Sequence, residues 1–297
     1  MRVTNKMLHT NLLRNLNRNL NMMSKTQEQM SSGKKVSRPS DNPIDVTLIM
    51  GMKSILSEQE THIKNMEDGI GWLEATDQAL ANLGEVVKRA SELALQGANG
   101  TASQDARIAI AQEIGQLIDE AKQIINTNYA GRYIFGGTNT SNPPVDGSNQ
   151  FRGNSSKMNW EIGPGVTIAI NTTGEVFNGG TVGTPPYEPQ MITVLKDLKT
   201  ALEDSSGDPS ASIGELDKQM DAILNERASV GAKSRRLEMA KSRAEEVNLD
   251  LGELTSKLED IDIAEVSMTY AMQEAVYQAA LMTGARILQP TLLNFLR

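Results

Sequence analysis

A heptad repeat runs through the C-terminal part of the chain and requires a partner for one whole face of a helix. From Val247 to Leu296, positions spaced by alternating steps of four and three residues are apolar except at Glu265, Arg286 and Gln289. The apolar positions are Val247, Leu251, Leu254, Leu258, Ile261, Met268, Met272, Ala275, Ala279, Met282, Leu293 and Leu296. A rhythm of this length predicts a helix that packs along another helix in a coiled coil. Pro290 predicts a kink close to the end of that helix.

A second repeat of the same kind lies near the N-terminus, where residues 5–32 are predicted to form a helix. Its repeat positions are Leu13, Leu16, Leu20, Met23, Gln27 and Met30. The other faces of this helix are rich in asparagine, which is a poor helix former. We therefore expect the helix to need a packing partner for its stability.

The segment SSGKKVSRPSDNPID then separates the N-terminal helix from the next one. Gly33 can end the first helix, and Pro39 and Pro43 exclude helix at the residue before each of them. Asn42 is placed to cap the following helix, with Pro43 at its first position. We interpret Gly33, Pro39, Asp41 and Pro43 as the linker residues.

The next part of the chain is predicted to be a long helical rod. Apolar residues recur at helical spacing from Ile44 to about Gln96, which corresponds to a helix of roughly 80 Å. The sequence GANGT ends it, and Thr101 with Gln104 can form a capping box for a third helix. Residues 131–190 are rich in Gly, Pro, Asn and Thr and contain short β-like runs at residues 133–135, 158–162 and 166–170.

After this β-rich insert, the helical pattern resumes near Pro189. It pauses at DSSGDPSAS and continues from about Ile213 to the C-terminus with little interruption. The chain would then leave along one rod and return along it, with the insert at the outer end and both termini at the other end.

Charge points to the same pairing of the two ends. From residue 1 to 38 the basic side chains are Arg2, Lys6, Arg14, Arg18, Lys25, Lys34, Lys35 and Arg38, against the single acid Glu28. From residue 245 to 274 the acidic side chains are Glu245, Glu246, Asp250, Glu253, Glu259, Asp260, Asp262, Glu265 and Glu274, against the single base Lys257. Opposite charge selects the partner, while burial of apolar surface provides most of the stability.

Composition and motifs exclude several classes of function. The net charge of -8 disfavours a nucleic-acid binder, and no apolar run reaches the length of about 18 residues that a membrane span needs. The chain has no cysteine and only two histidines, His9 and His62, neither of them near other metal ligands. We expect no metal, no cofactor and no catalytic site. The basic N-terminal stretch could contact nucleic acid or an anionic membrane, but its asparagines and few aromatics favour helix pairing.

Three segments resemble the flagellin superfamily. QMSSGKKVSRPSDNPID is similar to the flagellin pattern LSSGKRINRPSDDPAG, with Asn42 and Ile44–Asp45 as mild departures. TNYAGRYIFGGTNT and ALMTGARILQPTLLNFLR resemble segments of the superfamily's hook–filament junction branch more than those of its filament subunits. The resemblance covers roughly residues 1–140 and 215–297, and the insert between them matches nothing specific.

The resemblance implies a structural protein of the bacterial flagellum. It implies export through the flagellar apparatus without a cleaved signal peptide, an extracellular location, and terminal helices that are disordered in the free monomer and fold on assembly. The implied partners are other copies of the chain, hook-associated protein 1, flagellin and an export chaperone that binds the apolar C-terminal helix.

The expected fold is mainly α with a small β insert, an elongated flagellin-like rod with paired terminal coiled-coil helices. We divide it into residues 1–40 (inner-core helix and linker), 41–130 (first part of the rod), 131–190 (outer β-rich insert), 191–250 (second part of the rod) and 251–297 (C-terminal inner-core helix). The predicted assembly interface comprises Leu13, Leu16, Leu20, Met23, Met30, Leu251, Leu254, Leu258, Ile261, Met268, Met272, Met282, Leu293 and Leu296.

Three alternatives to a junction adaptor stay open at this point. The chain could be a short flagellin that polymerises into the filament, or a cytosolic coiled-coil scaffold. It could also be a secreted enzyme with a helical stalk, although residues 131–190 contain no catalytic constellation.

Overall fold

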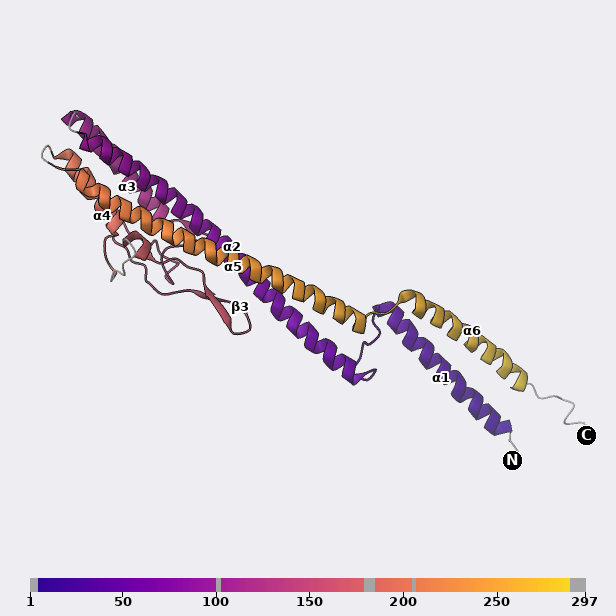
Figure 1. Ribbon diagram of the computed structural model, residues 1–297. Coiled ribbons are helices and arrows are strands. Elements are labelled where there is room, and N and C mark those ends of the chain that lie inside the picture. Colours follow the sequence, from indigo (N-terminus) through magenta and orange to yellow (C-terminus); the bar gives the residue numbers. More distant parts are fainter. Residues whose placement is uncertain (1–4, 100–102, 179–184, 205–206, 289–297) are drawn as a thin grey trace, which may run out of the picture. The chain divides into compact units, whose positions relative to one another are not determined.

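The computed structural model describes residues 5–99, 103–178, 185–204 and 207–288. These residues form six α-helices, one short 3-10 helix and four short strands (Figure 1). The helices are α1 (Asn5–Ser32), α2 (Pro43–Ala98), α3 (Gln104–Ile125), α4 (Gln190–Glu203), α5 (Ser210–Glu259) and α6 (Ile263–Leu288). The prediction of a mainly helical chain with a small β part is confirmed.

The chain divides into two compact units, which we describe separately. The terminal unit comprises Met1–Glu58 and Val247–Arg297, and the rod unit comprises Gln59–Glu246. Helices α2 and α5 contribute to both units. The five-segment division expected from the sequence is finer than this one and stays a prediction.

The rod unit is held together by an apolar core between helices α2, α3, α4 and α5. Its fully buried members include Leu73, Leu80, Leu83, Ala90, Ile114, Ile125, Leu195, Leu198, Leu216 and Leu237. Within each helix these positions are 3, 7, 11 or 21 residues apart, which places them on one face of that helix. Burial of such a side chain contributes about 1.5–3 kcal/mol, so this core is the main source of stability in the rod unit.

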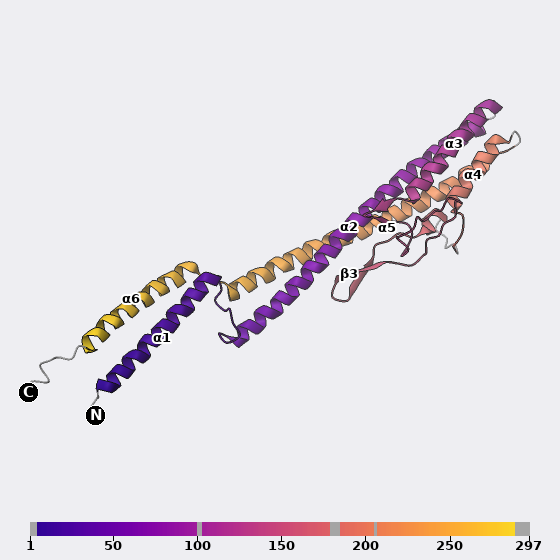
Figure 2. The same cartoon turned by 180° about the vertical axis from the view of Figure 1, so that it is seen from behind.

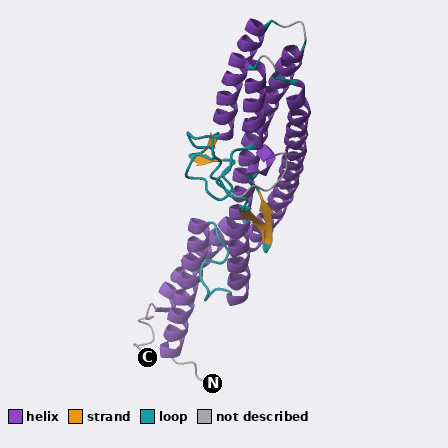
Figure 3. Cartoon of the chain, turned by 90° about the vertical axis from the view of Figure 1, so that its left-hand side faces the viewer, coloured by secondary structure: helices purple, strands orange, loops and turns teal. Residues whose placement is uncertain are grey.

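The β-rich part of the rod unit consists of two separate antiparallel hairpins (Figure 3). Strands β1 (Asn128–Tyr129) and β2 (Arg132–Tyr133) pair across a turn in which Ala130 and Gly131 have positive φ. Strands β3 (Asn159–Gly163) and β4 (Val166–Ala169) pair across a turn containing Gly165, whose φ is 70°. The runs expected at residues 158–162 and 166–170 are therefore strands, whereas the run at 133–135 contributes only Tyr133.

Most of the insert has no regular secondary structure but still buries an aromatic cluster. The ring of Phe177, in the 3-10 helix η1 (Gly174–Asn178), lies 5.0 Å from Phe135 and 6.4 Å from Phe151, measured between centroids. Phe151 also lies 5.3 Å from Tyr187. These rings give the insert an apolar centre that its short strands alone would not provide.

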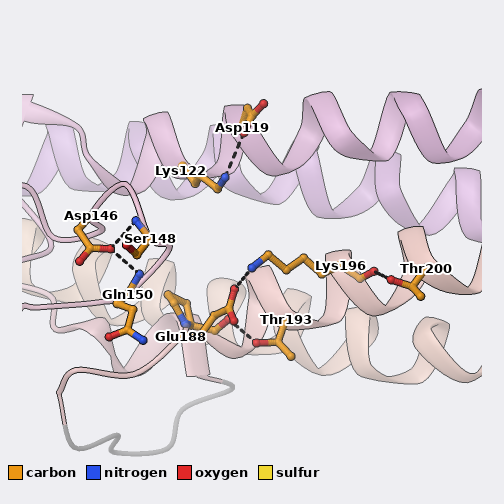
Figure 4. A network of polar contacts seen from close by, with 10 residues as sticks. Asp119, Lys122, Asp146, Ser148, Gln150, Glu188, Thr193, Lys196 and Thr200 are labelled. Carbon is orange, nitrogen blue, oxygen red and sulfur yellow. Dashed lines mark hydrogen bonds and ion pairs between the residues drawn. The ribbon is translucent and has the colours of Figure 1, made fainter.

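Polar contacts fix the loops around this cluster (Figure 4). The Asp146 carboxylate accepts backbone hydrogen bonds from Ser148 and Gln150, both at 2.9 Å, and an ion pair from Arg152 at 2.7 Å. The hydrogen bond from Gln150 and the ion pair with Arg152 hold the pKa of Asp146 below its usual value. On the neighbouring helix, Lys196 forms an ion pair with Glu188.

Two helix boundaries differ from the sequence prediction. The cap of α3 is Ser103, whose side chain accepts a hydrogen bond from the Ala106 amide, while Thr101 lies outside the described residues. The helix expected to continue from about Ile213 with little interruption has one break in the described residues, because α5 ends at Glu259 and α6 begins at Ile263. Asp262 causes this break by acting as a helix cap, since its carboxylate accepts the amides of Ala264 and Glu265 at 2.8 and 3.3 Å.

The rod core can be tested with one substitution and a matched control. We expect Leu80→Ala to lower the free energy of unfolding by about 2–5 kcal/mol, because it leaves a cavity at a fully buried site. Leu224→Ala removes a side chain that is 51% exposed and should cost less than about 1 kcal/mol. Urea unfolding followed by far-ultraviolet circular dichroism measures both, and equal losses would contradict the assigned core.

Candidate functional site

The two terminal helices, α1 and α6, pack along each other in the terminal unit (Figure 2). They run antiparallel, because Leu12 lies against Gly284 while Thr26 donates a hydrogen bond to the Gln273 side chain at 3.0 Å. The predicted pairing of the two ends of the chain is confirmed. At Gly284 the two helices approach closely, because an added Cβ would lie 2.7 Å from a methyl group of Leu12 and would require that side chain to move.

The face of α6 that contacts α1 combines aromatic, polar and small residues. Its less exposed positions include Val266, Tyr270, Gln273, Tyr277, Ala280 and Gly284. These positions are spaced by alternating fours and threes, so they form one stripe along the helix. The facing stripe of α1 comprises Leu12, Leu16, Asn19, Met23 and Thr26. The pair therefore combines apolar packing with the hydrogen bond between Thr26 and Gln273.

The apolar repeat of α6 that the sequence analysis singled out lies on a different face. Met268, Met272 and Met282 are 68%, 63% and 67% exposed, and Ala275 and Ala279 between them are exposed as well. These five residues, the methionine face, are offset by two positions from the contact stripe, which is a rotation of about 200° around the helix. The methionine face is therefore an apolar stripe that α1 of the same chain does not cover.

The other predicted interface residues are divided between buried and exposed places. Leu16 and Met23 lie half-buried on the α1 side of the pair, whereas Leu13, Leu20 and Met30 are exposed. At the end of α5, Leu251 and Leu258 are half-buried, Leu254 is exposed, and Ile261 lies half-buried in the break before α6. Leu293 and Leu296 lie outside the described residues. The role of this set in assembly stays a prediction.

The linker after α1 has the local structure that its sequence indicates. Gly33 ends α1 with a φ of 70°, and Pro43 is the first residue of α2. The side chain of Asn42 caps α2 by accepting the Ile44 amide at 3.2 Å. Asp41 forms an ion pair with Lys25 at 2.9 Å, and Lys25 is the main reason that the pKa of Asp41 is lowered. Pro39 is exposed in a turn.

The linker also crosses the break between α5 and α6, where it forms a short antiparallel bridge. The Lys35 amide donates to the Glu259 carbonyl at 2.6 Å, and the Ile261 amide donates to the Gly33 carbonyl at 3.1 Å. The Glu259 carboxylate is largely buried there and forms ion pairs with Lys34 at 2.6 Å and Lys53 at 2.7 Å. We call Glu259, Lys34 and Lys53 the linker latch. It joins α5, the linker and α2.

The electrostatics of the latch favour the charged form of all three groups. Burial raises the pKa of the Glu259 carboxyl, but the hydrogen bonds and charges of Lys34 and Lys53 outweigh burial and hold this pKa below its ordinary value. The hydrogen bond to Glu259 raises the pKa of Lys34. In the sequence Glu259 is one acid among many, and nothing in its spacing indicates that two lysines converge on it.

We expected the basic N-terminal and acidic C-terminal stretches to attract each other. Among the described residues, one ion pair joins the two stretches, between Lys34 and Glu259. Lys25 and Arg38 form local ion pairs with Asp41 and Glu28 instead. In the described part of the chain, Arg14 and Arg18 on α1 have no acidic partner within 4.0 Å. The basic surface of α1 is therefore largely unmatched.

An apolar groove lies in the terminal unit, between the start of α2 and the end of α5. It has a volume of about 710 Å³, and its lining is Pro43, Ile44, Thr47, Leu48, Gly51, Met52, Ile55 and Leu251. Elsewhere, the described residues contain no group of three His, Asp or Glu side chains arranged to hold a metal ion. None of the described helices combines the length and apolarity that crossing a bilayer requires.

Comparison with known families matches both ends of the chain. The family model for the bacterial flagellin N-terminal helical region matches residues 3–140, and the model for the bacterial flagellin C-terminal helical region matches residues 213–296. The region between the two matches contains most of the β-rich insert.

Similar proteins cover nearly the whole chain. Flagellar hook-associated protein 3 of Salmonella typhimurium is 25% identical over 95% of this chain and 96% of its own length. A flagellin of Bacillus subtilis is 24% identical over 94% of both chains. Among solved structures, Bacillus cereus FlgL covers 69% of this chain and 99% of its own, with 25% identity and a TM-score of 0.58. A putative flagellar hook-associated protein from Vibrio parahaemolyticus shares the fold, with 20% identity, a TM-score of 0.67, and coverage of 74% of this chain and 100% of its own.

The linker latch can be tested by proteolysis. We expect Glu259→Gln to speed trypsin cleavage after Lys35 about tenfold, because loss of the charge leaves two lysines without their buried partner. Glu253→Gln is the matched control, since Glu253 forms only an exposed ion pair with Lys257 and should leave the cleavage rate unchanged. Equal rates in the two variants would show that the latch does not hold the linker.

The same latch predicts a pH dependence with a defined sign. A carboxyl group whose pKa is lower in the folded state stabilises that state above its ordinary pKa, which is 4.5 for Glu259, and loses this effect as the pH falls. We therefore expect the wild type to protect the Lys35 and Ile261 amides from hydrogen exchange better than Glu259→Gln at neutral pH. The difference between the two proteins at equal pH should close in strong acid. A difference that persists below the lowered pKa would contradict the assignment.

Proposed function

Because the chain belongs to the bacterial flagellin family, we propose that it is a structural subunit of the flagellar axis that joins the hook to the filament. The observation that supports this role most directly is the similarity to hook-associated protein 3 along almost the entire chain. The flagellin-like ends support a structural part in the flagellum, to which this family and this fold belong.

The terminal helix pair would build the subunit interface. The methionine face leaves three large apolar side chains in water, and Leu13 and Leu20 of α1 are exposed as well. Their burial against neighbouring copies would provide the free energy of assembly. Long, unbranched methionine side chains suit an adaptor, because they repack against surfaces of different shape.

The proposed partners follow from a position between the hook and the filament. Copies of the chain itself would form the ring or tube, with hook-associated protein 1 on one side and flagellin on the other. An export chaperone would cover the apolar C-terminal helix before the chain leaves the cell. The protein would act outside the cell, without enzymatic activity, because its role is to assemble.

Two other readings have less support. A filament flagellin would share the fold, and the Bacillus subtilis flagellin has nearly the same identity, but the C-terminal segment resembles the junction branch. Electron microscopy separates the two, since purified filament flagellin grows into long filaments whereas a junction protein stays confined to the hook tip. A cytosolic scaffold would be found only inside intact cells.

Removal of residues 280–297 tests the role of the terminal pair. We expect the truncated chain to keep a folded rod unit, because that unit has its own core. In a strain that lacks the gene for this chain, the truncated protein should leave hooks without attached filaments, whereas the full chain restores them. Circular dichroism of the truncated protein provides the folding control. Normal attachment of filaments by the truncated chain would overturn the proposed function.

A further inference from the structure

The apolar groove of the terminal unit is lined by large aliphatic side chains that are exposed in this chain. Ile44, Leu48 and Ile55 line it while being 78%, 48% and 47% exposed. At Gly51, an added side chain would meet no atom within 4 Å, so the floor of the groove is open. On the α5 side Leu251 completes the lining. A row of large aliphatic side chains around an open floor fits the apolar edge of a helix.

The charged side chains on the α5 side of the groove are acidic. Asp250 directly precedes the lining residue Leu251, is exposed, and has no ion pair with any described residue. Glu253, one helical turn further on, pairs only with the exposed side chain of Lys257. The segment 247–253 of the terminal unit contains two acids, Asp250 and Glu253, and no base. The groove therefore favours an apolar helix that carries positive charge.

Helix α1 presents such an edge. Leu13 and Leu20 are seven residues apart, hence on the same side of the helix, and both are exposed. Arg14 and Arg18 lie one helical turn apart on an adjoining side of α1, about 130° around the helix from the two leucines, and lack acidic partners among the described residues. In its own chain α1 lies along α6, which it contacts through Leu12, Leu16 and Met23 instead. The edge with Leu13 and Leu20 is thus free for a second contact.

We infer that the groove of one copy receives α1 of a second copy, with Leu13 and Leu20 against Leu48 and Ile55, and Arg14 and Arg18 toward Asp250. This inference rests on the proposed function and specifies one of its subunit contacts. The methionine face of α6 is the less suitable occupant of the groove. The repeat positions on either side of this face are the acid Glu265 and the base Arg286, so the face has no row of basic side chains.

The contact is heterologous, since a groove on one copy meets a different surface, α1, on the next. Contacts of this kind continue from subunit to subunit and produce rings or helical arrays, rather than closed dimers. A junction between two tubular structures requires such propagation.

Cross-linking tests the pairing directly, because the chain has no native cysteine. Leu13→Cys and Leu48→Cys variants of the full chain are co-expressed in a strain that lacks the gene, and isolated hook–filament particles are treated with a short bis-maleimide. We expect a cross-linked dimer of the two variants. The control pair is Leu13→Cys with Leu224→Cys, an exposed leucine in the rod unit, which should give none. Cross-linking of Leu48→Cys to Met272→Cys instead, or to hook or filament proteins only, would overturn the inference.

A charge exchange provides the second test. Arg14→Glu with Arg18→Glu should reduce the number of attached filaments at least about tenfold, because it places like charges against Asp250. Adding Asp250→Lys and Glu253→Lys to the same chain should restore most of them. Wild-type attachment by the double glutamate variant, or no restoration in the exchanged chain, would contradict the pairing while leaving the proposed function intact. Failure of the wild-type chain to restore filaments would instead overturn the proposed function.

Discussion

The terminal unit depends on a buried carboxylate placed where two helices are interrupted. Glu259 is the last residue of α5, and its backbone and side chain together hold the linker and the start of α2 through Lys35, Lys34 and Lys53. A buried charge without partners would be costly, but two ammonium groups and a backbone bridge compensate it. Glu259 therefore ties α5 to the linker after α1 and to α2, while Gly33 ends α1 and Asp262 caps α6.

The pair of α1 and α6 shows how one helix serves two kinds of contact. Toward α1, helix α6 uses tyrosines, Ala280 and Gly284, which permit a close approach with defined geometry. On its exposed face it carries methionine and alanine; the methionine side chains are flexible and can pack against surfaces of different shape. A subunit that must hold its own ends together, and also accept neighbours, needs both faces. The methionines Met268, Met272 and Met282 of α6 consequently lie outside its intramolecular contact.

Much of the fold follows from the sequence, and the exceptions have a common cause. The bounds of α1 and α2 were predictable because Gly33, Asn42 and Pro43 are strong local signals. The Asp262 cap was also readable, since Glu265 follows it at the spacing of a capping box, but the apolar repeat across the break concealed it. Periodicity identifies an apolar stripe without revealing which partner covers it. The repeat of the methionine face is apolar but exposed within this chain, so its spacing did not reveal the stripe that contacts α1. The convergence of Lys34 and Lys53 on Glu259 depends on tertiary structure, so no linear pattern could have indicated it.

The antiparallel course of α1 and α6 has a practical consequence for anyone who wishes to label the protein. Asn5 and Leu288 lie at the same end of the helix pair, so a fluorescent or affinity tag fused at either terminus would lie close to the proposed subunit interface. The β3–β4 turn offers a better location, because Pro164 and Gly165 are exposed and the turn belongs to the rod unit. A short epitope inserted between these two residues would extend a hairpin tip, where additional chain is generally tolerated.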